Sequence, residues 1–158
     1  MNLRADERAN LEQFLERHRT GVRKALDGLS EADAAARLLP YTDMTIGGIV
    51  KHLAQMEDLW FSWKFAGADW PSPWPHGERE EWAWASAGAD TVAELAALYD
   101  AACERSRAVT AGRLLDEPAA SASFGKGPAS LRWILVQMTV ETAQHQGHLD
   151  LMLDVLKG

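Results

Sequence analysis

Residues 130–158 read SLRWILVQMTVETAQHQGHLDLMLDVLKG. Seven positions in this stretch are separated by alternating steps of four and three, which is the spacing of a helix face that packs on a core. These positions hold Ile134, Met138, Glu141, His145, His148, Met152 and Val155. The two ends of this seam are apolar, whereas its middle carries one carboxylate and two imidazoles. The pattern predicts a long helix that begins at Ser130 and has a polar break in its buried face.

The polar break predicts a metal site. Burying a carboxylate and two imidazoles costs several kcal/mol unless they are paired, and a divalent cation pairs with all of them together. Residues three or four apart on a helix project side by side and can share one ion. His52 lies on or beside the apolar face of another predicted helix and supplies a ligand from across the core. We therefore predict metal ligation by His52, Glu141, His145 and His148, with a metal-free hydrogen-bonded network as the alternative.

Three more long helical patterns precede the last one, and they span residues 6–26, 45–67 and 91–112. Thr91 and Glu94 form a capping-box pattern at the start of the third, and Ser30 can start a short extra helix that Pro40 ends. No β-alternation of useful length occurs. The sequence thus predicts an all-α four-helix bundle that forms a single domain over residues 1–158. The connections 67–90 and 113–129 are long enough for one of them to cross over the bundle.

The tryptophans are concentrated in one part of the chain. Six of the seven lie in the sequence between residues 60 and 84, and four of these fall in the predicted 67–90 loop. Tryptophans in a loop seek cover, so we expect this loop to be ordered or semi-ordered against the bundle. The cluster either walls an apolar substrate pocket above the metal or only packs the loop or a dimer contact.

Composition excludes several classes of protein. The formal net charge of −7 and the absence of a basic cluster argue against nucleic-acid binding. There is no apolar stretch of about 18 residues for a membrane span and no apolar signal core at the charged N-terminus, so we expect a cytoplasmic protein. Cys103 is the sole cysteine and is predicted to be a core thiol. His18 and His76 lack such a context and are predicted to be structural or surface residues.

Two segments resemble motifs of the DinB/YfiT-like superfamily of metal-binding four-helix bundles. The first is Thr45-Ile46-Gly47-Gly48-Ile49-Val50-Lys51-His52-Leu53, followed by Glu57, Trp60 and Phe61. The second is Glu141-Thr142-Ala143-Gln144-His145-Gln146-Gly147-His148-Leu149-Asp150, which resembles the last-helix motif of an actinobacterial branch. The resemblance covers essentially the whole chain. It implies a DinB-like bundle whose metal is held by His52, Glu141 and His145.

The resemblance also implies a reaction. Members similar to mycothiol-dependent maleylpyruvate isomerase have glutamate at the position of Glu141, whereas many relatives have histidine there. His148 is then a fourth metal ligand, a catalytic acid/base that carries a proton, or an alternative to Glu141. The implied function is a divalent-metal-dependent S-transferase that uses zinc or nickel and joins a small thiol such as mycothiol to a small electrophile. A non-catalytic metal-binding or ligand-binding stress protein and a metal-dependent hydrolase are the alternatives, and a homodimer is compatible with each.

Overall fold

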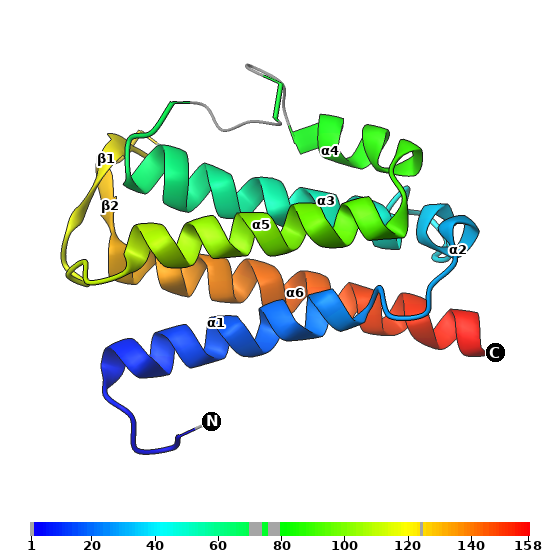
Figure 1. Ribbon diagram of the computed structural model, residues 1–158, viewed down its shortest axis with the longest axis horizontal. Helices are drawn as coiled ribbons and strands as arrows, with labels where there is room; N and C mark the ends of the chain where they lie inside the picture. Colours follow the sequence, from blue (N-terminus) through cyan, green and yellow to red (C-terminus); the bar gives the residue numbers. More distant parts are fainter. Residues whose placement is uncertain (1, 70–73, 76–79, 124) are drawn as a thin grey trace.

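The structure is a computed structural model that describes residues 2–69, 74–75, 80–123 and 125–158, with the backbone alone for residues 80–81. Its long helices are α1 (Glu7–Lys24), α3 (Ile46–Glu57), α5 (Val92–Thr110) and α6 (Leu131–Lys157), and α3 continues as the π-helix η1 (Asp58–Phe65). The four helices pack around a shared core (Figure 1). The predicted all-α bundle is therefore confirmed.

The helices begin where the sequence places capping side chains. Ser130 accepts a hydrogen bond from the backbone N–H of Trp133 at the start of α6. Thr91 and Glu94 form the predicted capping box at the start of α5. Such caps satisfy backbone donors that the first turn of a helix leaves unpaired. The expected helix starts are thus fixed by local hydrogen bonds.

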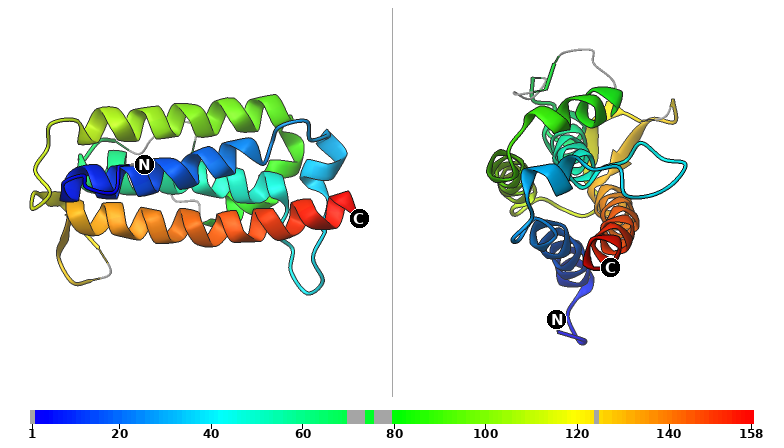
Figure 2. Two further views of the ribbon diagram at one scale, coloured as in Figure 1. Left: turned by 90° about the horizontal axis from the view of Figure 1, so that it is seen from below. Right: turned by 90° about the vertical axis from the view of Figure 1, so that its right-hand side faces the viewer.

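The bundle contains a crossover connection. Figure 1 shows α1 and α6 running in one direction, whereas α3 and α5 both run in the opposite direction. The chain must therefore return along the length of the bundle between the end of η1 and the start of α5. The end view in Figure 2 shows the four long helices in cross-section, with α4 lying on the outer side of α3. The order is up-down-down-up, one of the arrangements that the long connections allowed.

The crossover contains two helices that the sequence did not predict. The expected loop 67–90 includes α4 (Glu80–Ser86) and the short 3₁₀-helix η2 (Ala87–Ala89). Ala83 and Ala87 are buried where this segment packs on α3. The nearby prolines and glycines predict a loop, but packing on α3 stabilises a helix here, and local propensity does not show that contribution. Of the loop tryptophans, Trp74 is buried and Trp82 and Trp84 are half-buried; Trp70 lies outside the described residues.

A buried carboxylate fastens the crossover to the bundle. Asp58, at the start of η1, is fully buried. It accepts two hydrogen bonds from the guanidinium of Arg105 on α5, at 2.8 and 2.7 Å, and one from the indole N–H of Trp74, at 2.8 Å. Charge-assisted hydrogen bonds of this kind are among the stronger ones in proteins. The tryptophan of the crossover is thereby tied to two helices.

The connection before α6 contains a small β-ladder. Strands β1 (Pro118–Ala122) and β2 (Pro128–Ser130) pair antiparallel, with a register irregularity between the two paired ends. Strands this short and rich in alanine, serine and proline show no usable alternation in sequence.

The short helix α2 (Glu31–Ala35) also differs from its prediction, because it ends five residues before Pro40.

Helix α3 is the central element. All twelve of its residues are buried, because α2, α4, α5 and α6 pack around it. Its charged side chains have ionic partners: Lys51 pairs with Asp90, and Glu57 pairs with Arg19 of α1. Among the described helices, none has both the length and the apolar character to cross a bilayer.

The buried face of α6 is rotated from the predicted seam. Ile134, Met138 and Met152 are fully buried as expected, but Val155 is 52% exposed. Thr142 and Leu149, each one residue beyond a predicted seam position, are buried instead. A straight α-helix drifts by about 20° per heptad relative to a strict seven-residue repeat, which amounts to about 60° over the three heptads of the seam. Glu141 and His148 consequently lie nearer the edge of the core, whereas His145 is buried as predicted.

Candidate metal centre

Three of the four predicted ligands meet between α3 and α6. His52 lies in the middle of α3 with only 2% of its surface exposed. Glu141 and His145 lie one turn apart on α6, so both side chains face α3. One ligand atom from each of the three residues lies within 4.8 Å of the others. The cluster could hold a divalent metal ion.

The spacing of the donor atoms fits a small divalent ion. Nε2 of His52 lies 3.1 Å from Oε1 of Glu141, and Nε2 of His145 lies 3.3 Å from the same oxygen. Ligands bonded to tetrahedral zinc at about 2.0–2.1 Å are separated from one another by about 3.3–3.4 Å. Both nitrogen–oxygen distances are thus already close to the separation that such a site requires. Two imidazoles and one carboxylate also form a common donor set for catalytic zinc.

The cluster is incomplete as a hydrogen-bonded network. A carboxylate only accepts, so the His52 contact with Glu141 requires a hydrogen on Nε2 and leaves Nδ1 as a bare acceptor. The buried Nδ1 atoms of His52, His145 and His148 have no hydrogen-bond partner among the described residues. A buried polar atom without a partner costs about 1–3 kcal/mol. Hydrogen bonds among the described residues therefore do not satisfy all the polar atoms of these three histidines.

Glu141 carries the negative charge of the site. Hydrogen bonds with His145, and next with His52, lower the pKa of this carboxyl to about 2, although partial burial acts in the opposite direction. The group is therefore ionised at neutral pH. Its side chain keeps 24% of its surface exposed, whereas that of His52 keeps 3%. The site is consequently closed on the α3 side and open toward solvent at the edge of α6.

His148 lies beside the group of three. Its ring centroid is 5.4 Å from that of His145, with the two planes at 70°. It follows Glu141 by seven residues, so it lies on the same open flank of α6. It does not belong to the described set whose ligand atoms lie within 4.8 Å of one another. The arrangement brings His148 next to a ligand, and its predicted role stays a proposal.

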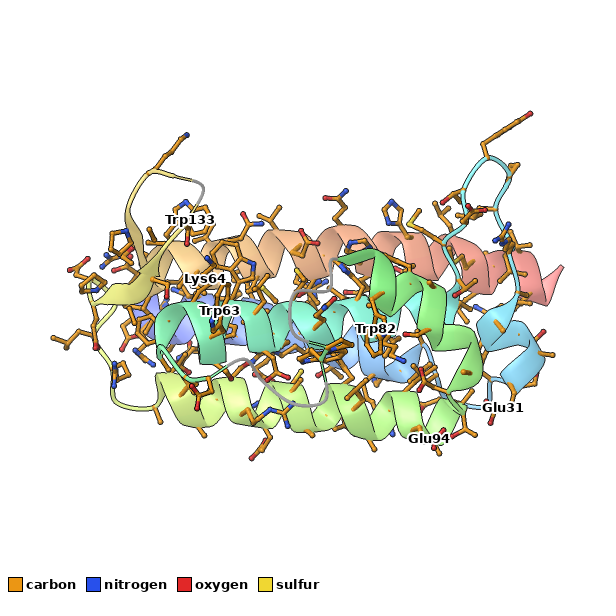
Figure 3. The ribbon with its side chains drawn as sticks, turned by 90° about the horizontal axis from the view of Figure 1, so that it is seen from above. Glu31, Trp63, Lys64, Trp82, Glu94 and Trp133 are labelled. Carbon is orange, nitrogen blue, oxygen red and sulfur yellow. The ribbon has the colours of Figure 1, made fainter. Side chains whose placement is uncertain are left out.

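Trp84 of α4 covers the two histidines. Its indole stacks on the imidazole of His52, with ring centroids 4.7 Å apart and planes at 22°, and it meets His145 at 5.8 Å and 45°. The sequence placed Trp84 in a tryptophan-rich stretch, but gave no sign of this contact. Figure 3 looks onto this face, where α4 with Trp82 lies over α3, while Trp63, Lys64 and Trp133 lie together near the strands.

The remaining candidate residues lie apart from the cluster. His18 is a structural residue, since its Nδ1 lies 2.8 Å from Oε1 of Gln146 and links α1 to α6. Cys103 is buried as predicted, and burial, with the nearby Glu57 carboxylate, raises the pKa of its thiol to about 12. Cys103 is therefore a packing residue rather than a nucleophile at neutral pH. His76 lies outside the described residues.

The fold and the cluster define the class of protein: a four-helix bundle with a histidine–carboxylate cluster between two helices that could hold a metal. Comparison with protein families then identifies the family. The model of the mycothiol-S-transferase family matches residues 10–158, and the chain belongs to this family. This family is DinB/YfiT-like, which confirms the resemblance of the two helix motifs. The comparison with curated proteins finds no match.

Proposed function

We propose that this protein is a divalent-metal-dependent S-transferase that joins mycothiol to a small electrophile. The observation that carries this proposal is the convergence of His52, Glu141 and His145 at the open edge of α6. Family membership over residues 10–158 supports a low-molecular-weight thiol as one substrate. Three protein ligands leave a coordination position for a substrate, which is the arrangement of a catalytic site rather than a structural one.

Zinc or nickel is the ion that we propose for this site. Imidazole nitrogens suit zinc and nickel, and a single carboxylate completes a set with one negative charge. A divalent ion held there would lower the pKa of a thiol and so supply a thiolate nucleophile near neutral pH. Glu141, ionised and placed between the two histidines, contributes the charge that retains the ion.

His148 is our candidate for the proton carrier. During transfer, the thiol sulfur forms a bond to the electrophilic carbon and the thiol proton is taken up by a base. In a substitution the leaving group departs with its bonding electron pair, and in an addition the proton returns to the neighbouring carbon. His148 lies on the open flank next to His145, and its Nδ1 has no partner among the described side chains. A histidine in this position can accept and return the proton.

Space for the electrophile lies beside Trp84. An open surface depression with a volume of about 260 Å³ is lined by Thr42, Asp43, Met44 and Trp84. It shares the indole of Trp84 with the metal cluster, so a molecule bound there would lie near the histidines. Its indole and methionine offer apolar contacts to a small substrate, and its lining also carries the carboxylate of Asp43.

The reaction can be tested with a fluorogenic alkyl halide as the electrophile. The protein is freed of metal with a chelator, reloaded with Zn²⁺ or Ni²⁺, and assayed with and without mycothiol. We expect thioether formation to require both the metal and mycothiol. Replacement His148→Ala should leave the metal content unchanged and lower the rate by about 100-fold, the lower end of what a positioned acid or base contributes. His18→Ala, which removes a histidine outside the cluster, is the matched control and should retain the wild-type rate.

The same assay separates the alternatives. Stoichiometric metal without turnover, across several thiols and electrophiles, would contradict the transferase and support a metal-binding protein. Metal-dependent cleavage of an ester in the absence of any thiol would support a hydrolase instead.

A further inference from the structure

Two contacts hold the imidazole of His52, and each restricts a different movement of the ring. The stack with Trp84, at 4.7 Å and 22°, fixes the plane of the ring. The 3.1 Å contact between Nε2 and Glu141 fixes the rotation of the ring within that plane. Metal ligands in proteins need such support, because a ring that turns away from the ion no longer donates its lone pair to it.

A glycine on α3 makes room for the stack. Gly48 lies one turn before His52, and a Cβ placed on it would come within 3.0 Å of Cε3 of Trp84. A contact of this length is tighter than most Cβ contacts in proteins, so a side chain at position 48 would push the indole away from α3 by a few tenths of an ångström. The same Cβ would also lie 3.0 Å from Oγ1 of Thr45. Thr45 caps α3, and its Oγ1 accepts a hydrogen bond from the backbone N–H of Gly48.

Helix α4 holds Trp84 in this place. Ala83 and Ala87 are buried against α3 on either side of it in sequence. Trp82 lies with its ring 4.6 Å from Nζ of Lys51, which itself pairs with Asp90 beyond the helix. The indole of Trp84 is thus placed by α4 rather than by free rotation of a surface side chain.

We propose that Trp84 is a positioning residue of the metal site, which orients His52 toward the ion and covers the two histidines. This inference rests on the proposed metal-dependent function. Its electrostatics are favourable, since an imidazole that binds a cation becomes more positive and the face of an indole is negative. Tryptophan stabilises such a ring best, a phenylalanine less well, and an aliphatic side chain of similar bulk only through packing.

The test measures metal affinity and the visible absorption spectrum of the Co²⁺-loaded protein. Co²⁺ is titrated into wild type, Trp84→Phe and Trp84→Leu in competition with a chromogenic chelator. We expect about 10-fold weaker binding for Trp84→Leu, at the low end of the 10- to 100-fold typical when a side chain that orients a ligand is lost. The absorption bands, which report the coordination geometry, should change in Trp84→Leu and be restored largely in Trp84→Phe.

The matched control is Trp133→Leu, the same substitution at a tryptophan of α6 that is 40% exposed and whose ring contacts Trp60, and it should leave Co²⁺ affinity and spectrum unchanged. A second variant, Gly48→Ala, keeps Trp84 but displaces its ring, and should also weaken Co²⁺ binding. Wild-type affinity and spectrum in both Trp84→Leu and Gly48→Ala would overturn the positioning role, and this result does not depend on Trp84→Leu folding alone. If wild type itself binds no Co²⁺, the proposed function fails and the positioning role fails with it.

Discussion

Replacing Glu57 by glutamine removes the negative charge that faces a buried guanidinium. Glu57 is fully buried on α3, and Arg19 of α1 is 5% exposed. Nε of Arg19 donates to Oε1 of Glu57 at 2.8 Å, and Nη2 donates to the other oxygen, so the pair is bidentate. Desolvation by burial acts to lower the pKa of the Arg19 guanidinium, but the Glu57 carboxylate outweighs this effect and the pKa is raised. The ion pair links the first helix of the bundle to its central helix.

The expected loss of stability follows from the environment that remains. Removing one partner of a buried pair costs about 3–5 kcal/mol, because the other charge stays buried without compensation. Glu16 remains 2.6 Å from Nη1 of Arg19 with 39% of its side chain exposed, so it compensates part of the charge. We therefore expect a loss of about 3 kcal/mol for Glu57→Gln. In a chain of this length, that corresponds to a fall of about 6–12 °C in Tm.

Thermal and urea unfolding of the purified variant, followed by circular dichroism, would measure this loss. Glu104→Gln is the matched control, because Glu104 pairs with Arg107 at the surface and is 76% exposed. It should leave Tm unchanged. Replacing both partners by methionine should recover much of the stability lost in Glu57→Gln. A Tm for Glu57→Gln within about 2 °C of wild type would refute the reasoning, since it would mean a change below about 1 kcal/mol.

Four further predictions concern single residues and pH. Gly147→Ala should raise the free energy of unfolding by about 0.5–1 kcal/mol, because Gly147 lies inside α6 and a Cβ there meets no atom within 4 Å; chemical denaturation measures this, and a destabilised variant would contradict it. Cys103 should react with iodoacetamide at pH 8 only after denaturation, since its thiol is buried and has a pKa of about 12; fast labelling of the native protein, detected by mass spectrometry, would contradict this. Because this folded-state pKa lies above the ordinary 9.0, the associated stability is complete below about pH 9 and is lost as pH rises toward 12, so alkaline unfolding should be less steep in Cys103→Ala. Metal occupancy should fall between pH 7.5 and pH 5 at about constant total metal, because histidines must be neutral to bind an ion; occupancy that stays flat on dialysis over this range would argue against histidine ligation.

The three residues of the cluster could be predicted to lie together because helical spacing is a local property. Glu141 and His145 are four residues apart, so any helix brings them together, and polar residues in an apolar seam need a partner. His52 could be matched to them because it interrupts an apolar face of its own. The prediction that Val155 is buried is wrong, because a straight helix rotates away from a strict heptad repeat and the side chain is exposed.

The cover of the site could not be predicted from the sequence. The stack of Trp84 on His52 depends on where the crossover lays α4 on α3, and no local pattern encodes that placement. Likewise, nothing in the sequence pairs Arg19 with Glu57, which are 38 residues apart on different helices. Long-range contacts of this kind arise from packing, and they decide which polar residues the fold can bury.

Metal content of the purified protein tests the central claim most directly. Wild type, His52→Ala, Glu141→Gln, His145→Ala and the control His18→Ala are purified in parallel and analysed by inductively coupled plasma mass spectrometry. The account predicts about one Zn²⁺ or Ni²⁺ per chain in wild type and in His18→Ala, and a loss of most of it in the three cluster variants. Equal, substoichiometric metal in all five proteins would contradict it.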